Sequence, residues 1–209
     1  MNIRTKKWLS GLILCSVVWG VCAQQPRKQE AKFVYMSSLG FNSGVGSIRI
    51  PDKTVPVRNA EFLLQQLLAY QFNNYVFTGV GAGINIWKRT AFIPIYAALH
   101  VNFIDRKVSP HWYLNAGYSF KWYMNNKPEA LTRIIHGNAS GIYGESGLGV
   151  KIKVSDKFSV LTVVNYVLQQ STIRYSVVEP NEPDFSAYAT NRSQTALYHF
   201  VGFRVGFLY

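Results

Sequence analysis

The feature that most constrains this chain is a strict alternation of apolar residues with smaller or polar ones, repeated along most of its length. In FIPIYAALHVNFID, every second residue from Ile93 to Phe103 is apolar, and His100 and Asn102 lie on the other face. HWYLNAGYSFKWYM repeats the arrangement. A period of two is typical of β-strands with one face in an apolar environment. The sequence therefore predicts an all-β fold.

Eight segments show this pattern, near residues 33–43, 61–73, 75–87, 92–105, 111–124, 140–154, 158–170 and 195–209. The second and seventh alternate poorly, and AEFLLQQLLAY could instead form a short amphipathic helix. The neighbouring Asn73-Asn74 pair favours a tight hairpin turn and therefore a strand. Connections after the second, fourth and sixth segments are short, whereas those after the first, fifth and seventh are long. Short turns at one end and long loops at the other are typical of outer-membrane barrels.

Charged residues are confined to one face of these segments. In the third to eighth segments the apolar face has no Asp, Glu, Lys or Arg. The opposite face holds Lys121, Glu145, Lys151, Lys153 and Arg204. A Lys or Arg on the lipid-facing side at mid-bilayer costs about 2–4 kcal/mol, so a membrane barrel excludes charge there. The segregation predicts a monomeric, eight-stranded antiparallel up-and-down transmembrane barrel with its charges in the lumen. Trp87 and Trp122 are expected in an aromatic belt at its outer rim.

The first 23 residues have the composition of a signal peptide. Basic MNIRTKKW precedes the apolar stretch LSGLILCSVVWGV, and small residues before Gln24 predict cleavage after Ala23. Residues 1–23 are then the signal peptide and 24–209 the barrel domain. Lipidation of Cys22 is an alternative, although lipoprotein processing favours a small residue where Val21 stands.

Cleavage would remove three of the 22 basic residues and none of the 10 acidic ones, leaving a net charge of +9. An exported chain seldom meets nucleic acid, so anionic lipid headgroups are the expected counterpart. Basic residues in the long connections could bind lipopolysaccharide phosphates. Cleavage would also remove both cysteines, so no disulfide is expected. The four histidines lack metal-site spacing, and no cofactor is expected.

The last segment, HFVGFRVGFLY, ends on an aromatic residue. We expect it to close the barrel against the first strand, because hydrocarbon leaves no backbone group unpaired. With the signal peptide and the alternating segments, this ending resembles small outer-membrane barrels of the OmpA-barrel/OmpX type, similar to the porin-family barrels of Bacteroidota. The resemblance implies a Gram-negative outer-membrane location. It also implies that the barrel-assembly machinery reads the last strand, through Val201, Phe203, Val205, Phe207 and Tyr209.

Glu145 is the acidic residue expected at a lumenal position away from the strand ends. If the fifth and sixth segments form a hairpin, Lys121 comes opposite it, which would suit a gate or a proton-linked pair. We favour instead a buried ion pair with Arg204 or Lys151 that plugs the lumen, because an eight-stranded barrel has room only for side chains. Glycines on the inner face, such as Gly81, are expected to relieve crowding by aromatic rings.

Three functions remain open for a barrel of this kind. The leading hypothesis is a structural or surface-binding protein with a plugged lumen and no catalytic residues. The second is a narrow diffusion channel. The third is an enzyme that modifies lipid A, since IIHGNASGIYGES contains His136, Ser140 and Glu145, residue types that the lipid A deacylases use. It departs from their His-x-Ser-Asn motif, because Asn138 stands in the Ser position and Ser140 lies four residues from His136. A secreted soluble β-barrel or sandwich is the alternative to a membrane protein.

Overall fold

The computed structural model describes residues 32–50, 53–87, 90–124, 133–177 and 190–209. The predicted signal peptide and its cleavage site, Ala23 and Gln24, lie outside these residues. The strands are β1 (Lys32–Val45), β2 (Ser47–Ile50), β3 (Lys53–Pro56), β4 (Ala60–Gln71), β5 (Val76–Trp87), β6 (Thr90–Asn102), β7 (Val108–Met124), β8 (Arg133–Ala139), β9 (Gly141–Lys153), β10 (Ser159–Val177) and β11 (Thr190–Leu208). Within the described part of the chain, no helix is long and apolar enough to cross a membrane.

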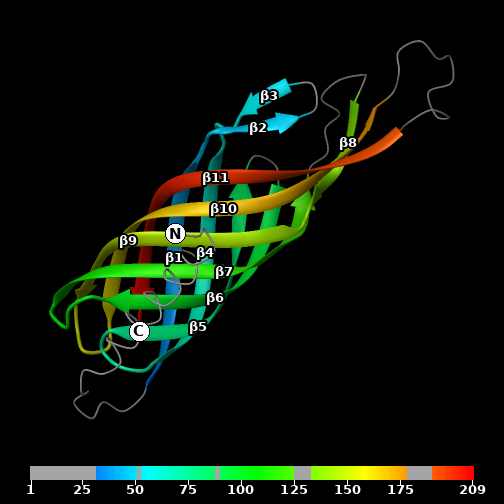
Figure 1. Ribbon diagram of the computed structural model, residues 1–209. Coiled ribbons are helices and arrows are strands. Elements are labelled where there is room, and N and C mark those ends of the chain that lie inside the picture. Colours follow the sequence, from blue (N-terminus) through cyan, green and yellow to red (C-terminus); the bar gives the residue numbers. More distant parts are fainter. Residues whose placement is uncertain (1–31, 51–52, 88–89, 125–132, 178–189) are drawn as a thin grey trace, which may run out of the picture. The chain divides into compact units, whose positions relative to one another are not determined.

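Eight strands close into an antiparallel barrel, in the order β1, β4, β5, β6, β7, β9, β10 and β11 (Figure 1). β11 pairs with β10 on one side and with β1 on the other. At this seam Tyr35 and Tyr209 exchange two backbone hydrogen bonds, of 2.8 and 2.9 Å. The predicted fold class and the closure of the last strand against the first are therefore confirmed.

The ambiguous segment AEFLLQQLLAY is strand β4, as the hairpin turn had indicated. The backbone nitrogen of Phe72 donates to the carbonyl of Val76 across the turn, at 3.1 Å. The side-chain oxygen of Asn73 accepts from the backbone nitrogens of Tyr75 and Val76, at 2.8 Å each. Asn favours turns because its side chain can replace a backbone acceptor in this way, so the register of β4 against β5 is fixed locally.

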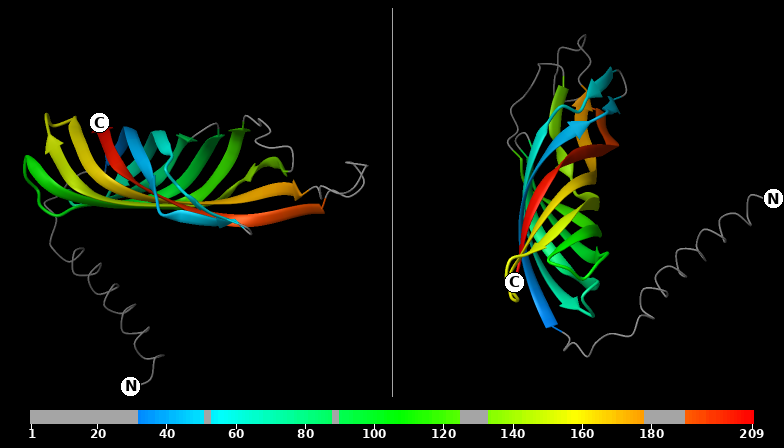
Figure 2. Two further views of the ribbon diagram at one scale, coloured as in Figure 1. Left: turned by 90° about the horizontal axis from the view of Figure 1, so that it is seen from above. Right: turned by 90° about the vertical axis from the view of Figure 1, so that its left-hand side faces the viewer.

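The two ends of the barrel differ in their connections. The "turn end" carries the short turns 72–75, 103–107 and 154–158 together with Tyr209. The "loop end" carries the longer connections, which hold more structure than predicted (Figures 1 and 2). β2 and β3 form a hairpin within the long connection after the first segment, and β8 lies within the one after the fifth. β10 and β11 stay paired as far as Val177 and Thr190, well beyond the expected strand ends.

Outward positions of the barrel wall are apolar or neutral. Phe41, Phe62, Val80, Leu148 and Val164 are among the exposed side chains on this surface. The outward positions of β1, β4, β5, β6, β7 and β9, those of β10 as far as Thr172 and those of β11 from Ser193 contain no Asp, Glu, Lys or Arg. A surface of this kind suits hydrocarbon, and the predicted segregation of charge to the lumen is confirmed for Glu145 and Arg204, which are both 2% exposed.

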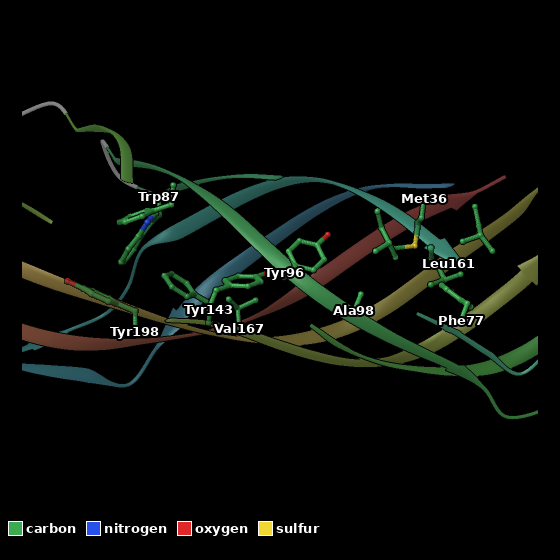
Figure 3. Packing of buried hydrophobic residues seen from close by; sticks show 14 of the residues in the cluster. Met36, Phe77, Trp87, Tyr96, Ala98, Tyr143, Leu161, Val167 and Tyr198 are labelled. Carbon is green, nitrogen blue, oxygen red and sulfur yellow. The ribbon is translucent and has the colours of Figure 1, made fainter. Parts of the chain in front are cut away.

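Aromatic side chains fill the lumen toward the loop end (Figure 3). Trp87 is 4% exposed, and its ring packs edge-on against Tyr198 and Phe200 at centroid distances of 4.3 and 5.1 Å. The expectation that Trp87 belongs to an external belt was therefore wrong, because residue 87 shares the inward face of β5 with Phe77 and Asn85. Trp122, by contrast, lies on the outside and is 63% exposed.

Candidate functional site

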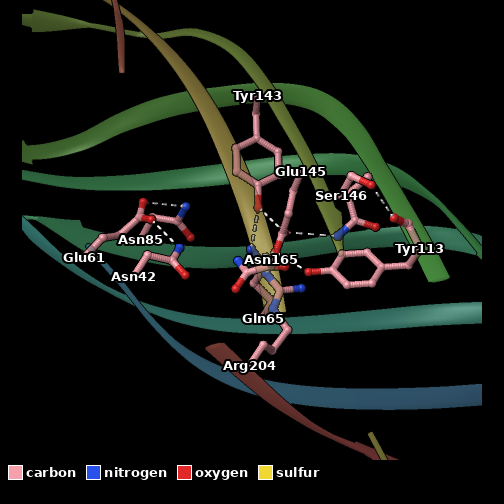
Figure 4. Close-up of polar contacts among 11 residues, drawn as sticks. Asn42, Glu61, Gln65, Asn85, Tyr113, Tyr143, Glu145, Ser146, Asn165 and Arg204 are labelled. Atoms are coloured by element: carbon pink, nitrogen blue, oxygen red, sulfur yellow. Dashed lines mark hydrogen bonds and ion pairs between the residues drawn. The ribbon is translucent and has the colours of Figure 1, made fainter. Parts of the chain in front are cut away.

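The centre of the lumen is organised around one carboxylate, that of Glu145 (Figure 4). It forms a salt bridge with the guanidinium of Arg204, and both side chains are almost wholly buried. Four further side chains donate hydrogen bonds to its two oxygens: Tyr113 Oη at 2.6 Å, Tyr143 Oη at 2.5 Å, Asn165 Nδ2 at 3.0 Å and Asn115 Nδ2 at 3.3 Å. We call these six residues the "central network".

Strand pairing explains why these residues meet. Asn115 on β7 is directly opposite Glu145 on β9. Asn165 is opposite Gly147 across the β9–β10 pair and opposite Gly202 across the β10–β11 pair. The network thus joins four consecutive strands of the wall. Tyr143 extends it across the lumen, because its hydroxyl also accepts a 2.8 Å hydrogen bond from Gln65 Nε2 on β4.

Lumenal glycines make room for the tyrosine rings of this network and its surroundings. A Cβ added to Gly147 would lie 2.5 Å from Cε1 of Tyr113, and one added to Gly81 would lie 2.4 Å from Cζ of Tyr96. Any larger residue at these two positions would displace a ring. The expected role of inner-face glycines in relieving crowding is therefore confirmed at both positions.

A second buried carboxylate, Glu61 on β4, was missed by the sequence analysis. It is 0% exposed and accepts hydrogen bonds from Asn42 Nδ2 at 2.7 Å and Asn85 Nδ2 at 3.1 Å. Both of its donors are neutral amides, whereas Glu145 also has a guanidinium partner. The sequence signal was weak because both faces of β4 carry leucines, Leu63 inside and Leu64 outside.

Two histidines lie in contact near the turn end of the lumen. Their separation in the sequence is not one that is typical of metal sites. His100 Nδ1 and His111 Nε2 are 3.0 Å apart, and His111 Nδ1 is 2.9 Å from Asn102 Oδ1. Since the amide oxygen can only accept, His111 Nδ1 carries the proton and His100 Nδ1 donates to His111 Nε2. The His100 ring is stacked on Phe77, with a centroid distance of 4.5 Å. Among the described residues, no group of three or more His, Cys, Asp or Glu side chains could hold a metal ion.

The structure brings together only part of the predicted lumenal charge network. Glu145 and Arg204 form the ion pair, and Lys151 lies half-buried on the same face of β9. Lys153 is exposed at the turn end, where its Nζ is 2.9 Å from Asp156 Oδ1. Lys153 therefore does not belong to the lumenal network, because β9 has already reached solvent at this residue.

Of the arrangements considered for Glu145, the favoured ion pair with Arg204 is present, whereas the pairing with Lys121 is not. Glu145 is opposite Asn115, six residues before Lys121 on β7, which is about 20 Å along a strand. The shift arises because residues 133–139, expected in a loop, form β8 and continue the ladder against β10. Lys121 instead lies near the loop end, where its backbone nitrogen donates to Ser140 Oγ at 3.0 Å.

Among the residues considered for lipid A chemistry, the structure describes the side chains of Ser140 and Glu145. The Ser140 hydroxyl is engaged with the backbone of Lys121, and Glu145 is held inside the lumen by the central network. The side chains of His136 and Asn138 lie outside the described residues. The described members of this set therefore do not form a nucleophile–base pair within hydrogen-bonding reach.

The last strand presents the predicted alternation on the outside of the barrel. Val201, Phe203, Phe207 and Tyr209 are exposed, and Val205 is half-buried on the same face. Next to the seam, Ser37 Oγ donates to Gln66 Oε1 at 2.8 Å and lies 3.0 Å from the Tyr209 hydroxyl. Polar groups on this otherwise apolar surface are thus paired with one another, as a hydrocarbon environment requires.

Comparison with known proteins identifies the fold. No protein-family model and no curated protein matches the sequence. Among solved structures, the outer membrane protein OprG from Pseudomonas aeruginosa is similar with a TM-score of 0.54 at 11% identity, covering 88% of this chain and 98% of that one. The outer membrane protein AlkL, solved in lipid bilayers, is similar with a TM-score of 0.50 at 8% identity, covering 90% and 94%. This chain has the fold of a small outer-membrane β-barrel. At these identities the likeness concerns the fold alone.

Proposed function

We propose that this chain is an integral barrel of a Gram-negative outer membrane that is closed to solutes and serves as a structural or surface-binding protein. The observation that carries the proposal is the central network, which joins side chains from β7, β9, β10 and β11 and is connected across the lumen to Gln65 on β4. The fold and the uncharged outer wall support the membrane location. Both termini would lie in the periplasm, the loop end would face outward, and no catalytic residue is assigned.

Energetics support a closed lumen. Removing one partner of a buried ion pair typically costs about 3–5 kcal/mol, because it leaves an uncompensated charge. Moving Arg204 aside to admit a solute would incur a comparable penalty and would also break up the donors around Glu145. Opening is therefore rare on this proposal, and the parts exposed to solvent, above all the loop-end hairpin β2–β3 and the extension of β8, β10 and β11, carry the surface function.

Conductance in a planar lipid bilayer tests this proposal. The folded wild-type chain should show no discrete conductance steps, whereas Arg204→Ala, which removes the guanidinium of the central network, should produce flickering events. Val164→Ala, on the outer wall, serves as the matched control and should remain silent. Regular conductance steps from the wild type would contradict the closed lumen.

A narrow diffusion channel is the second candidate, and the polarity of the lumen favours it. Buried Asn, Gln, Ser and Glu side chains occur along the length of the inner wall, from Glu61 toward the loop end to Asn102 at the turn end. On this alternative, the wild type conducts, and Glu145→Gln changes its ion selectivity. The bilayer experiment therefore separates the two candidates directly.

A further inference from the structure

The turn end carries a concentration of positive charge contributed by three segments. Exposed cations come from the start of β1, the β6–β7 turn and the β9–β10 turn, and we call them the "basic turn patch": Lys32, Arg106, Lys107, Lys153 and Lys157. The carboxylates of the same segments are Asp105 and Asp156. Five cations against two carboxylates give this region a net charge of +3.

Contacts show that the three segments are neighbours. The backbone nitrogen of Lys153 donates to the carbonyl of Lys107 at 2.7 Å, which joins the two turns. The hydrogen bond and charge of Lys153, with a smaller contribution from Lys32, hold the pKa of Asp156 below its usual value. Backbone pairing places the start of β1 beside the β9–β10 turn, because Tyr35 pairs with Tyr209 and the preceding Leu208 is opposite Ser159, the first residue of β10. The two carboxylates are already engaged, Asp156 by Lys153 and Asp105 by Asn74 Nδ2 at 2.6 Å.

Exposed apolar side chains lie beside these cations along both turns. Phe103 and Val108 flank the β6–β7 cations and are 57% and 52% exposed, and Val154 beside Lys153 is 59% exposed. Phe33, next to Lys32, is 76% exposed. A soluble polyanion would neutralise the cations but leave these side chains in water. A lipid leaflet satisfies both, since its acyl region takes up the apolar groups and its phosphates meet the cations.

We propose that the basic turn patch binds the phosphate groups of anionic phospholipids in the leaflet that surrounds the turn end. Arg106, Lys107 and Lys157 supply the charge, and the exposed apolar residues beside them fix its depth at the headgroup level. The inference rests on the membrane-barrel part of the proposed function and is independent of whether the lumen conducts.

Native mass spectrometry of the chain folded in a non-ionic detergent tests this inference. The protein is titrated with phosphatidylglycerol or with phosphatidylcholine carrying the same acyl chains. Each cation near an anionic surface contributes roughly a fivefold preference. The wild type should therefore bind phosphatidylglycerol at least about tenfold more tightly than phosphatidylcholine, and Arg106→Gln/Lys107→Gln/Lys157→Gln should reduce that preference to about twofold or less.

The control variant is Arg106→Lys/Lys107→Arg/Lys157→Arg, which exchanges the cations at the same three positions and keeps the charge of the patch. It should retain the wild-type preference. Arg106→Gln alone should give an intermediate preference. Heat-modifiable gel mobility, measured on every sample, reports separately whether the barrel has folded. Three results would each overturn the proposal. They are an equal loss of the phosphatidylglycerol preference in both triple variants, no such preference in the wild type, and competition by glycerol 3-phosphate that is as effective as competition by phosphatidylglycerol.

Discussion

Glu145 and Glu61 are both buried in the lumen, but their surroundings differ. Glu145 has a guanidinium partner and four further donors, from tyrosine and asparagine side chains. Glu61 has two amide donors and is contacted by no cation among the described hydrogen bonds and ion pairs. The first arrangement couples four strands through one charge pair. The second connects β4 only to its two neighbours, β1 and β5.

The comparison indicates where the lumen is rigid. Breaking the central network leaves an unpaired charge in a closed space, whereas changing Glu61 alters two hydrogen bonds between adjacent strands. Net contributions of about 1.5–3 kcal/mol are typical of hydrogen bonds to charged groups, and a broken buried ion pair costs more. Stability should therefore depend far more on Arg204 and Glu145 than on Glu61.

Arg204→Met should have the largest effect. It leaves the Glu145 carboxylate buried without its cation, so the free energy of unfolding should fall by about 3–5 kcal/mol. Urea unfolding in lipid vesicles, followed by heat-modifiable gel mobility, measures the change. Arg58→Gln, at an exposed position, should change it by less than about 0.5 kcal/mol. A loss for Arg204→Met as small as that of the control would remove the distinction between the two carboxylates.

Gly147→Ala should have an intermediate effect. The added methyl group would displace the Tyr113 ring that donates to Glu145, and overpacking of this kind typically costs about 1–3 kcal/mol. Gly144→Ala is the matched control on the same strand, because the nearest atom to its Cβ is 4.0 Å away. Both variants are compared by the same urea titration. If they proved equally stable, the role assigned to the Tyr113 ring would be wrong.

Glu61→Gln should have the smallest effect, about 1 kcal/mol or less. The glutamine oxygen can still accept from Asn42, and Asn85 can rotate its amide so that Oδ1 accepts from the new NH2 group. The urea midpoint of this variant, set beside that of Glu145→Gln, gives the comparison directly. A greater loss for Glu61→Gln than for Glu145→Gln would reverse the proposed order.

The orientation of side chains was predictable from the sequence because strand alternation has an exact period. Glu145 and Arg204 were assigned to the lumen on this basis, and both lie there. Trp87 was misplaced although it shares the face of Asn85, because a preference for aromatic belts outweighed the alternation. Glu61 was missed because β4 has leucines on both faces, so the pattern does not distinguish inside from outside.

Contacts between strands were less predictable than orientation. Which residue faces Glu145 depends on the register of β7 against β9, and that register depends on the length and structure of the connection between them. Its Asn125-Asn126 pair matches Asn73-Asn74 of the β4–β5 turn, but the connection is too long for one such pair to fix the register. The sequence therefore favoured Arg204 or Lys151 as the partner of Glu145, and coordinates were needed to identify Arg204.

The seam between β1 and β11 has a consequence for how the chain reaches its final form. Ser37 and Tyr209 are 172 residues apart in sequence, and contacts this remote form late and slowly. Until they form, the first and last strands expose backbone amides that have no hydrogen-bond partner, which is costly in hydrocarbon. Before closure, the backbone amides of these two edge strands must therefore stay hydrated or be covered by another protein.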